Sequence, residues 1–395
     1  MQNNLYMFDL KQVTPYYQPI ISADTHSIYG YEVLGRISDG TKATTLGPFF
    51  HNPDVSDEDK LTVDTHIQNL VFENMIKQTN SQLFFINVHA NHLMKENSDS
   101  LIERLFVWQK RGLHFERLVI EMTEHNFHGD ITELTEKLAF LKSLGIKIAL
   151  DDVGIGASNL DRVGILEPDI LKVDIHSLKN NEPTISYHGV MSSLSYLARK
   201  IGADLLFEAI ENNHDLHYSW RNNGRFFQGY FLSRPNPQLL DENVFKAQFK
   251  DKIREFIQLE KKKLNVEFTL SIDLNCRLQH IMKKIHSFES LDQTMIRVAS
   301  QLGDICYRMY ITDEDGFQQT SNAVKINGNW ILKTNFKGMN WSWRPYFLEN
   351  IIKMEQENKG ILSDIYSDIE TGDLIRTFSF PISKNLFLFI DIPIM

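Results

Sequence analysis

The chain has 395 residues, enough for two or three domains with hydrophobic cores, and its 42% hydrophobic and 23% charged residues are those of an ordinary globular protein. A formal net charge of −10 argues against a general nucleic-acid binder, whose surface would be basic, but it is compatible with a small anionic ligand held by a local cation. Two cysteines without a paired spacing argue against a disulfide framework and a thiolate metal site. Neither a signal peptide nor an apolar stretch of about 18 residues is visible, so we expect a cytoplasmic protein without a membrane span.

Short apolar runs alternate with longer segments of helical periodicity from about residue 16 to residue 240. The runs cover 27–36, 82–88, 117–124, 146–152, 169–174, 203–211 and 225–232. Between them, Asp130 and Glu133 form a capping box for a helix that Gly145 ends, and a second helical stripe over 190–201 ends at Gly202. This alternation predicts an α/β architecture with a largely parallel sheet, and periodicity alone leaves a doubly wound sheet and a barrel open.

Polar side chains recur at the C-terminal ends of six successive runs. They are Asn87, Glu121, Asp151, Asp152, Lys172, Glu208, Glu211 and Gln228, and Glu32 and Arg36 stand in the run before them. Each residue alone is better explained as a solvated loop residue. The series favours a (β/α)₈ barrel, in which the strand ends converge on one mouth.

The run at 146–158, IKIALDDVGIGAS, ends on the adjacent carboxylates Asp151 and Asp152 and turns on Gly154 and Gly156. Two neighbouring acids at the end of an apolar strand repel each other, and a metal pair would compensate that cost. The alternative is a surface turn with both carboxylates in water.

The carboxylates and the asparagine at the strand ends form an oxygen-donor set that suits Mg²⁺ or Mn²⁺ better than Zn²⁺. Several carboxylates would allow two metal ions to share a bridging aspartate, an arrangement that supports phosphodiester hydrolysis. In the same mouth, Lys172 could hold the attacking water, and the forked guanidinium of Arg36 suits a phosphate.

From residue 241 the alternation stops and the charge rises. We expect a helical connector over 241–289, broken once near 265–273, with one apolar stripe before the break and another after it. The stripes are Phe249, Ile253 and Phe256, then Leu274, Leu278, Ile281 and Ile285. A helix docked on its own domain is favoured over a signalling coiled coil.

Residues 290–395 have the pattern of a small α+β domain with an antiparallel sheet. We expect strands at 304–312, 329–331, 373–382 and 386–394, with a hairpin turn between the last two, and a helix at 343–354. Trp341, Trp343, Tyr346 and Phe347 beside Arg344 either line a small-molecule pocket or pack in the core.

The ordered motifs resemble the EAL domain over about residues 14–238. They are YYQPI (16–20), EVLGR (32–36), FINV (85–88), EMTE (121–124), DDVGIG (151–156), PDILKVD (168–174), EAIE (208–211) and QGYFLSRP (228–235). The resemblance implies a modified TIM (β/α)₈ barrel that hydrolyses cyclic di-GMP to linear pGpG with Mg²⁺ or Mn²⁺, whereas Ca²⁺ would bind and inhibit. A homodimer is also implied.

The resemblance also implies a role for each matching residue. Metal would be held by Glu32, Asn87, Glu121, Asp151 and Asp152, with Asp152 serving the second ion. Lys172 and Glu208 would act on the attacking water, and Glu211 and Gln228 would support the site. Substrate would contact Glu32, Leu34 and Arg36, while Glu124, Gly154 and Gly156 would support the loop.

The whole chain resembles the YkuI-like subgroup of that family, which implies three parts: an EAL barrel at 1–240, a helical connector at 241–289 and a PAS/Cache-like sensory domain at 290–395. The sensory domain would bind an unknown small ligand or a protein. Val33, His89, Val153, Ile155, Ala157, Asn159 and Ala209 depart from the family pattern. The loop changes among them leave two alternatives to catalysis: a cyclic di-GMP receptor without useful turnover, and a scaffold that has lost both functions.

Overall fold

The computed structural model describes residues 9–394 except 39, 41, 79, 95–99, 124–126, 128, 155–159, 177–184, 286–289, 304 and 345–346. The chain divides into two compact units, Met1–Phe256 and Ile257–Met395. In the part of the chain that is described, no helix is both long enough and apolar enough to cross a membrane.

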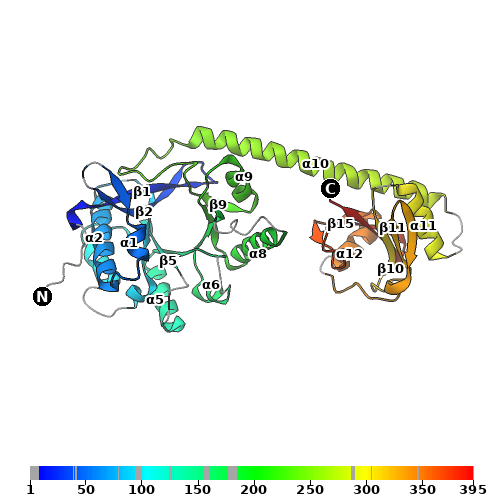
Figure 1. The fold of residues 1–395 in the computed structure, drawn as a ribbon, viewed down its shortest axis with the longest axis horizontal. Coiled ribbons are helices and arrows are strands. Elements are labelled where there is room, and N and C mark those ends of the chain that lie inside the picture. The colour runs from blue at the N-terminus through cyan, green and yellow to red at the C-terminus, as the bar shows by residue number, and fades with distance from the viewer. Residues whose placement is uncertain are drawn as a thin grey trace. The chain divides into compact units, whose positions relative to one another are not determined.

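Eight strands of the first unit close into a barrel, seen as a ring in Figure 1. Seven of them run parallel to their neighbours: β2 (Ile28–Ser38), β4 (Leu83–Asn87), β5 (Leu118–Thr123), β6 (Lys147–Asp151), β7 (Ile170–Asp174), β8 (Asp204–Glu208) and β9 (Gly224–Phe227). The eighth, β1 (Val13–Ser22), closes the ring antiparallel to both β2 and β9, and β3 (Ala43–Thr45) extends β2. The expected modified TIM barrel is confirmed.

Strand β1 is the barrel strand that the apolar runs did not predict. Pro15 and Pro19 interrupt its sequence, and proline cannot donate a hydrogen bond to a ladder. The strand accommodates them because it is an edge over most of its length: β9 pairs only with Ile21 and Ser22 at its end.

Helices surround the barrel on the outside. They are α1 (Gly47–His51), α2 (Asp57–Ile76), α3 (Ala90–Leu93), α4 (Leu101–Gln109), α5 (Ile131–Ser143), α6 (Leu160–Leu166), α8 (Ile185–Ile201) and α9 (Asn213–Arg221), with 3₁₀ turns at Leu10–Gln12 and Phe115–Arg117. Asp130 caps α5 by accepting a hydrogen bond from the backbone N–H of Thr132, and Gly145 beyond its C-terminus has a φ of 91°. Asp130 as the N-cap and Gly145 as the glycine that ends the helix are confirmed, whereas the carboxylate of Glu133 lies 3.4 Å from Lys137 Nζ, so Asp130 alone is seen to cap the helix.

The barrel interior is filled by one layer of apolar side chains. It consists of Ile20, Leu83, Phe85, Val119, Ala149, Ile170, Leu206 and Phe226, which form a cluster separate from the larger core between strands and helices. Such a layer makes the barrel a packed core instead of a pore. Any polar site must therefore lie above or below it.

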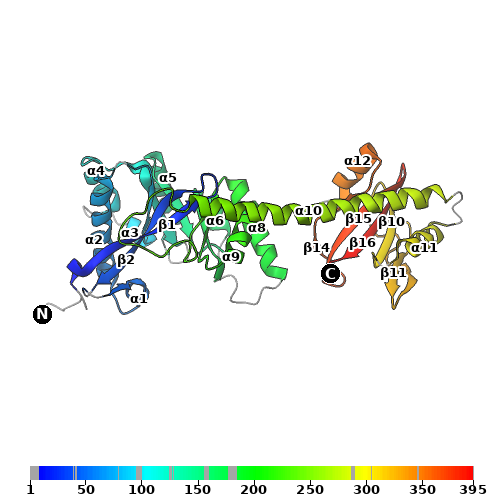
Figure 2. The same cartoon turned by 90° about the horizontal axis from the view of Figure 1, so that it is seen from above.

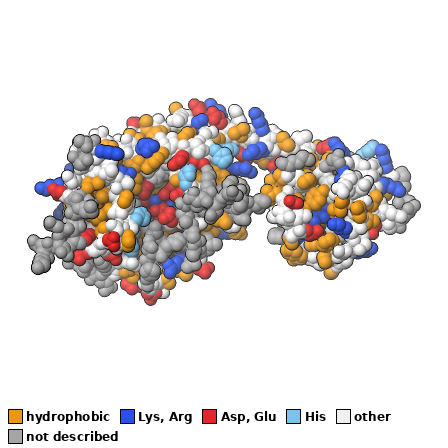
Figure 3. Space-filling view, viewed as in Figure 1, with side chains coloured by type: hydrophobic (Ala, Val, Ile, Leu, Met, Phe, Trp, Pro, Cys, Tyr) orange, Lys and Arg blue, Asp and Glu red, His pale blue; other side chains and the backbone are white. Residues whose placement is uncertain are grey.

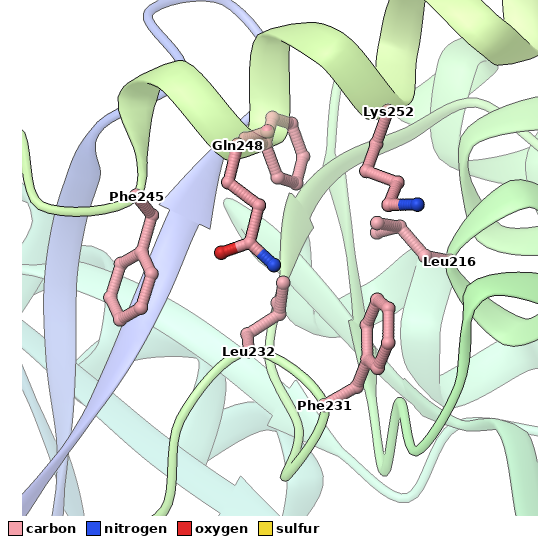
Figure 4. A pocket seen from close by; sticks show the side chains of 7 residues that line it. Leu216, Phe231, Leu232, Phe245, Gln248 and Lys252 are labelled. Atoms are coloured by element: carbon pink, nitrogen blue, oxygen red, sulfur yellow. The ribbon is translucent and has the colours of Figure 1, made fainter.

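Helix α10 (Lys246–Lys283) is continuous, so the expected break near 265–273 is wrong. Neither glycine nor proline occurs within it to break the helix. The lysines and glutamates in its middle are good helix formers, so their charge does not indicate a loop. Its first turns cover an apolar hollow on the barrel, shown in Figure 4, where Gln248 and Lys252 point from α10 towards Leu216, Phe231 and Leu232.

The second unit is built on an antiparallel sheet in the order β12-β11-β10-β16-β15-β13, with β14 beside β15. Its strands are β10 (Arg308–Asp313), β11 (Asn322–Ile326), β12 (Asn329–Lys333), β13 (Ile361–Leu362), β14 (Tyr366–Ser367), β15 (Leu374–Ser383) and β16 (Leu386–Pro393). The helices are α11 (Leu291–Leu302) and α12 (Phe347–Glu357), with a 3₁₀ turn at Thr334–Phe336. The expected small α+β domain and its last hairpin are confirmed.

Alternate side chains place the two helices of this unit over opposite faces of the sheet, as Figure 2 also shows. Met309 packs in the cluster of α11, while its neighbour Tyr310 packs in the cluster of α12. The aromatic residues near α12 do not share one environment. Trp341 and Phe347 pack in the core, but Trp343 is 63% exposed, and Tyr346 lies outside the described residues.

A buried ion network lies on the face of the sheet that α12 covers, the face of Tyr310. The guanidinium of Arg308 donates to Asp391 at 2.6 Å and to both carboxylate oxygens of Asp368 at 2.8 and 3.2 Å. Thr377 donates to the other oxygen of Asp391 at 2.6 Å. Because all four side chains are buried, these contacts compensate charges that water cannot reach.

Candidate active site

A polar layer lies directly above the apolar layer of the barrel. Side chains alternate along a strand, so the residue two positions after an inward-facing apolar residue also faces inward, about 6.5 Å closer to the strand end. On each of six parallel strands, an apolar residue of the lower layer is followed two positions later by a polar residue of the upper layer. The pairs are Phe85 and Asn87, Val119 and Glu121, Ala149 and Asp151, Ile170 and Lys172, Leu206 and Glu208, and Phe226 and Gln228. On β2, Glu32 follows Gly30, which has no room for a side chain because Leu83 and Phe85 approach it.

Four carboxylates of this layer surround the ammonium of Lys172. Its Nζ lies 2.6 Å from Glu208 Oε1, 2.9 Å from Glu121 Oε1, 3.4 Å from Asp151 Oδ1 and 3.8 Å from Glu32 Oε1. The side chains of Lys172 and Glu121 are 1% and 0% exposed, whereas that of Glu208 is 20% exposed. Figure 3 shows acidic side chains at the centre of the barrel, where this group opens to the surface.

Burial and mutual repulsion shift the pKa values of the group. Burial raises the pKa of Glu121 to about 8, although Lys172 acts in the opposite direction. Burial, together with the neighbouring carboxylates, also raises the pKa of Glu208 well above its usual range. Burial alone would lower the pKa of Lys172, but Asp151, Glu121, Glu208 and Glu32 raise it well above its ordinary value.

Hydrogen bonds brace the layer from β9 and β1. The side-chain amide of Gln228, only 3% exposed, donates to Glu32. Gln18 on β1 pairs in register with Glu32, and its amide donates to the backbone oxygen of Ser233 at 3.1 Å. Gln18 was not among the predicted site residues, although YYQPI contains it. Since β1 runs antiparallel, its inward side chain comes two positions before the apolar Ile20 and not after it.

The layer fits a divalent cation by its chemistry. Both carboxylate oxygens of Glu121 and one of Glu208 are buried and lack a hydrogen bond of good geometry, even though Lys172 is close enough for an ion pair. Among the described residues, no three acidic, histidine or cysteine side chains already form a metal cage. The carboxylates converge on Lys172 instead, so binding a cation requires some of them to turn from it.

The turn after β6 places its two acids differently. Asp151 is partly buried in the layer, whereas Asp152 is exposed and has a φ of 56°, in the left-handed region that few residues other than glycine occupy. Gly154 has a φ of 95°, which explains the glycine there. Val153 is fully buried, and its backbone N–H donates to the oxygen of Lys172 at 3.1 Å. This departure from the family pattern therefore packs in the larger core between the strands and the helices.

Arg36 and Leu34 continue the inward face of β2 beyond Glu32. By the rise of a strand, Arg36 stands about 13 Å further along the chain than Glu32. Its guanidinium donates to Gly35 O at 3.0 Å and to Thr45 Oγ1 at 3.3 Å, and it lies 5.9 Å from the ring centroid of Tyr16. The structure therefore places Arg36 at the rim, where a phosphate could reach it.

Glu211 stands apart from the carboxylate layer. It follows β8 in a loop, its side chain is 56% exposed, and its carboxylate lies 3.6 Å from His176 Nε2. Asp174, at the end of β7, was not among the predicted site residues. It is the register partner of Glu208 and stands two positions after Lys172, so the same alternation that found the other residues could have found it. The predicted loop residues Glu124 and Gly156 lie outside the described residues.

Two family models match the chain. The EAL domain matches residues 2–235, and an EAL-domain associated signalling protein domain matches residues 239–395. A similar protein is the EAL-domain containing protein YkuI of Bacillus subtilis (strain 168), which is 43% identical over 387 residues, covering 98% of this chain and 95% of that protein.

A solved structure and a further relative are also similar to this chain. The crystal structure of Bacillus subtilis YkuI in complex with cyclic di-GMP and calcium superposes with a TM-score of 0.92, covering 98% of this chain and 97% of that one. The probable cyclic di-GMP phosphodiesterase PdeN of Escherichia coli (strain K12) is 26% identical over 232 residues, which are 58% of this chain and 44% of that protein.

Proposed function

This chain belongs to the EAL-domain family of cyclic di-GMP phosphodiesterases, and from that membership we propose that it hydrolyses cyclic di-GMP to linear pGpG. The observation that carries the proposal is the layer of four carboxylates, one buried and three partly buried, around the buried Lys172 at the barrel mouth. The complex of the similar Bacillus subtilis protein with cyclic di-GMP supports the ligand. Two unpaired cysteines, Cys276 and Cys306, fit the reducing cytoplasm in which we place the protein.

We assign metal binding to Glu32, Asn87, Glu121, Asp151 and Asp152, and we propose Mg²⁺ or Mn²⁺ as the active cation and Ca²⁺ as an inhibitor. The buried oxygens of Glu121, which lack hydrogen bonds, support a cation at this position. When bound, such ions lower the pKa of a coordinated water and stabilise the charge that develops on the phosphate.

The chain's own residues would handle substrate and protons. Arg36 and Leu34 would hold the substrate at the rim, the forked guanidinium of Arg36 contacting a phosphate. A water oxygen forms the new bond to phosphorus while the bond from phosphorus to the 3′ oxygen breaks. Bound cations would offset the burial that raises the pKa of Glu208, so that its ionised carboxylate would accept the proton of that water. Lys172 would balance the charge beside it, and the leaving oxygen would take up a proton from solvent. Gln228 orients Glu32, and Glu211 supports the loop after β8.

The test is to incubate the purified protein with cyclic di-GMP and Mg²⁺ or Mn²⁺ and to follow pGpG by chromatography. Glu32→Ala and Asp151→Ala should each lower the rate at least a hundredfold. Glu136→Ala, which removes an exposed carboxylate from α5, should leave the rate unchanged. Absence of product from the wild-type protein with either metal would refute the phosphodiesterase.

A cyclic di-GMP receptor without useful turnover is the second candidate. The exposed position of Asp152, next to loop residues that depart from the family pattern, favours it. Calorimetric titration decides between the two: tight binding of cyclic di-GMP without product over hours identifies a receptor. A protein that neither binds nor hydrolyses the ligand would be a scaffold.

We further propose that the second unit is a PAS/Cache-like sensor of a small ligand or protein and that it sets the rate of the barrel. Deleting residues 290–395 should then change the rate of hydrolysis or the oligomeric state, which we expect to be a homodimer. If the truncated chain keeps both unchanged, the second unit has no regulatory role.

A further inference from the structure

Gln68 is a polar residue on the buried face of α2, where its neighbours Ile67 and Phe72 are apolar. Burying an amide is costly unless its donor and its acceptor both find partners. The Oε1 atom of Gln68 accepts a hydrogen bond from the guanidinium of Arg104 on α4, and its Nε2 atom donates to the backbone oxygen of Asn87 at 3.4 Å. The side chain therefore joins a helix on the outside of the barrel to the end of β4.

Arg104 determines which way the amide of Gln68 points. A guanidinium only donates hydrogen bonds, so the oxygen of the amide, and not its nitrogen, has to face Arg104. The guanidinium is itself held on α2, because its Nη1 atom donates to Thr65 Oγ1 at 2.7 Å. With its oxygen engaged in this way, the amide presents its N–H group to the carbonyl of Asn87.

The carbonyl of Asn87 points to a side of β4 where the pairing of strands has ended. The N–H of Val88 donates to the oxygen of Glu121 on β5 at 2.8 Å. The C=O and N–H of one trans peptide point in opposite directions, so the carbonyl of Asn87 points away from β5 and towards the side of β2. On that side the described pairing of β4 with β2 ends at Phe85, two residues earlier. Gln68 thus supplies the donor that a neighbouring strand supplies elsewhere in the sheet.

We propose that Gln68, oriented by Arg104, is a positioning residue for Asn87: it fixes the peptide after Asn87 and so holds the side chain of Asn87 in the polar layer of the barrel mouth. The inference rests on the proposed function in one respect, the assignment of Asn87 as a ligand of the divalent cation. Substitution of an outer residue that holds a metal ligand in place typically lowers metal affinity roughly ten- to a hundredfold.

The affinity of the full chain for Mn²⁺, measured by electron paramagnetic resonance, tests this role. Gln68→Met keeps most of the side-chain volume but removes the donor to Asn87, so it should weaken Mn²⁺ binding about tenfold. Gln109→Met is the matched control, because it makes the same change at an exposed position at the end of α4 and should leave the affinity unchanged. An unchanged affinity in Gln68→Met would overturn the proposal.

A double-mutant cycle tests whether the effect passes through Asn87. In an Asn87→Ala background the side chain to be positioned is gone, so adding Gln68→Met should weaken Mn²⁺ binding further by less than about twofold. If Gln68→Met lowers the affinity as much in that background as in the wild-type protein, Gln68 acts on the barrel as a whole and the positioning role is refuted.

Arg104→Met is a second variant, which keeps Gln68 but removes the group that orients its amide. It should also weaken Mn²⁺ binding, and circular dichroism checks that both variants keep their helices. The role is separable from catalysis: if the wild-type protein binds Mn²⁺ but forms no pGpG, weaker binding by Gln68→Met still supports it. A wild-type protein that binds no Mn²⁺ would overturn both the metal assignment and the positioning role.

Discussion

At the scale of single residues, Ala209 occupies a conformation that suits glycine better. It follows β8 with a φ of 54°, and the left-handed region costs a non-glycine residue about 1 kcal/mol. Glycine at this position removes that cost, but it also raises the conformational entropy of the unfolded chain, which opposes folding. On balance, Ala209→Gly should raise the unfolding free energy of the barrel by about 0.5 kcal/mol. Urea unfolding followed by tryptophan fluorescence measures this. Ala198→Gly, at a buried helical position in α8, should instead lower the unfolding free energy by about 1 kcal/mol. If Ala209→Gly also lowers the unfolding free energy, the strain at Ala209 is refuted.

Glu121 should make the metal-free protein less stable as the pH rises. Its pKa is about 8 in the folded chain against 4.5 for an ordinary glutamate, so the folded state holds the proton more tightly. The resulting stabilisation is complete below pH 4.5 and is lost as the pH rises through 8. In a chelator, Glu121→Gln should therefore raise the unfolding free energy on the order of 2 kcal/mol at pH 9 and leave it unchanged at pH 4.

Two further measurements check the cause of this effect. Glu136→Gln, at an exposed position on α5, should show no gain at either pH. Adding Mn²⁺ should stabilise the wild-type protein more than Glu121→Gln, because the variant lacks a carboxylate of the proposed metal site. Equal stability of the wild-type protein at pH 4 and pH 9 without metal would contradict the pKa of Glu121.

Most of the polar layer could be predicted from the sequence because a parallel strand repeats its inward face every second residue. Because Val119 and Ile170 face the barrel interior, the rule predicts that Glu121 and Lys172, two positions later, also face inward. What the sequence could not provide is the convergence of the carboxylates on Lys172, since that depends on the radius of the closed barrel. Gln18 was missed for a related reason: only the direction of β1 in the sheet places it in the layer.

At the scale of secondary-structure elements, the ion network of Arg308 should be a main determinant of the stability of the second unit. Arg308→Met leaves the buried carboxylates of Asp368 and Asp391 without a counter-charge, which should cost about 3–5 kcal/mol. Calorimetric unfolding of the second unit measures the loss. Arg297→Met on the exposed side of α11 should change it by less than about 0.5 kcal/mol, and a similar small effect at Arg308 would refute this role.

The elements themselves were predictable to different degrees. The seven parallel strands follow the apolar runs closely, for example β5 at Leu118–Thr123 within the predicted 117–124. Strand β1 was missed because its prolines obscure the run, and β11 and the short strands β13 and β14 because their pairing depends on distant partners. The prediction of a break in α10 was wrong because the apolar stripe of the helix changes where it leaves the core of the first unit and enters that of the second. That change in packing partner does not interrupt the helix.

At the scale of the whole molecule, α10 is the covalent path between the two units. Val266→Pro removes a helical hydrogen bond midway between the residues that pack in the two cores, at a local cost of about 3 kcal/mol. Both units should still unfold at their wild-type temperatures. If the second unit regulates the barrel through this helix, the rate of cyclic di-GMP hydrolysis should change in Val266→Pro and not in Val266→Ala. Identical rates in both variants would exclude control through α10.

The seam between β1 and β9 has a consequence for how the protein is made. Ile21 pairs with Phe227, so the first strand to leave the ribosome cannot complete the ring until almost the whole barrel has been synthesised. At 5–20 residues per second this wait lasts on the order of 10–40 seconds. During that time the nascent chain exposes an unpaired strand edge beside apolar residues, the kind of surface that chaperones recognise and that aggregates form on. The barrel therefore closes late in translation, and its yield in the cell should depend on protection of that edge.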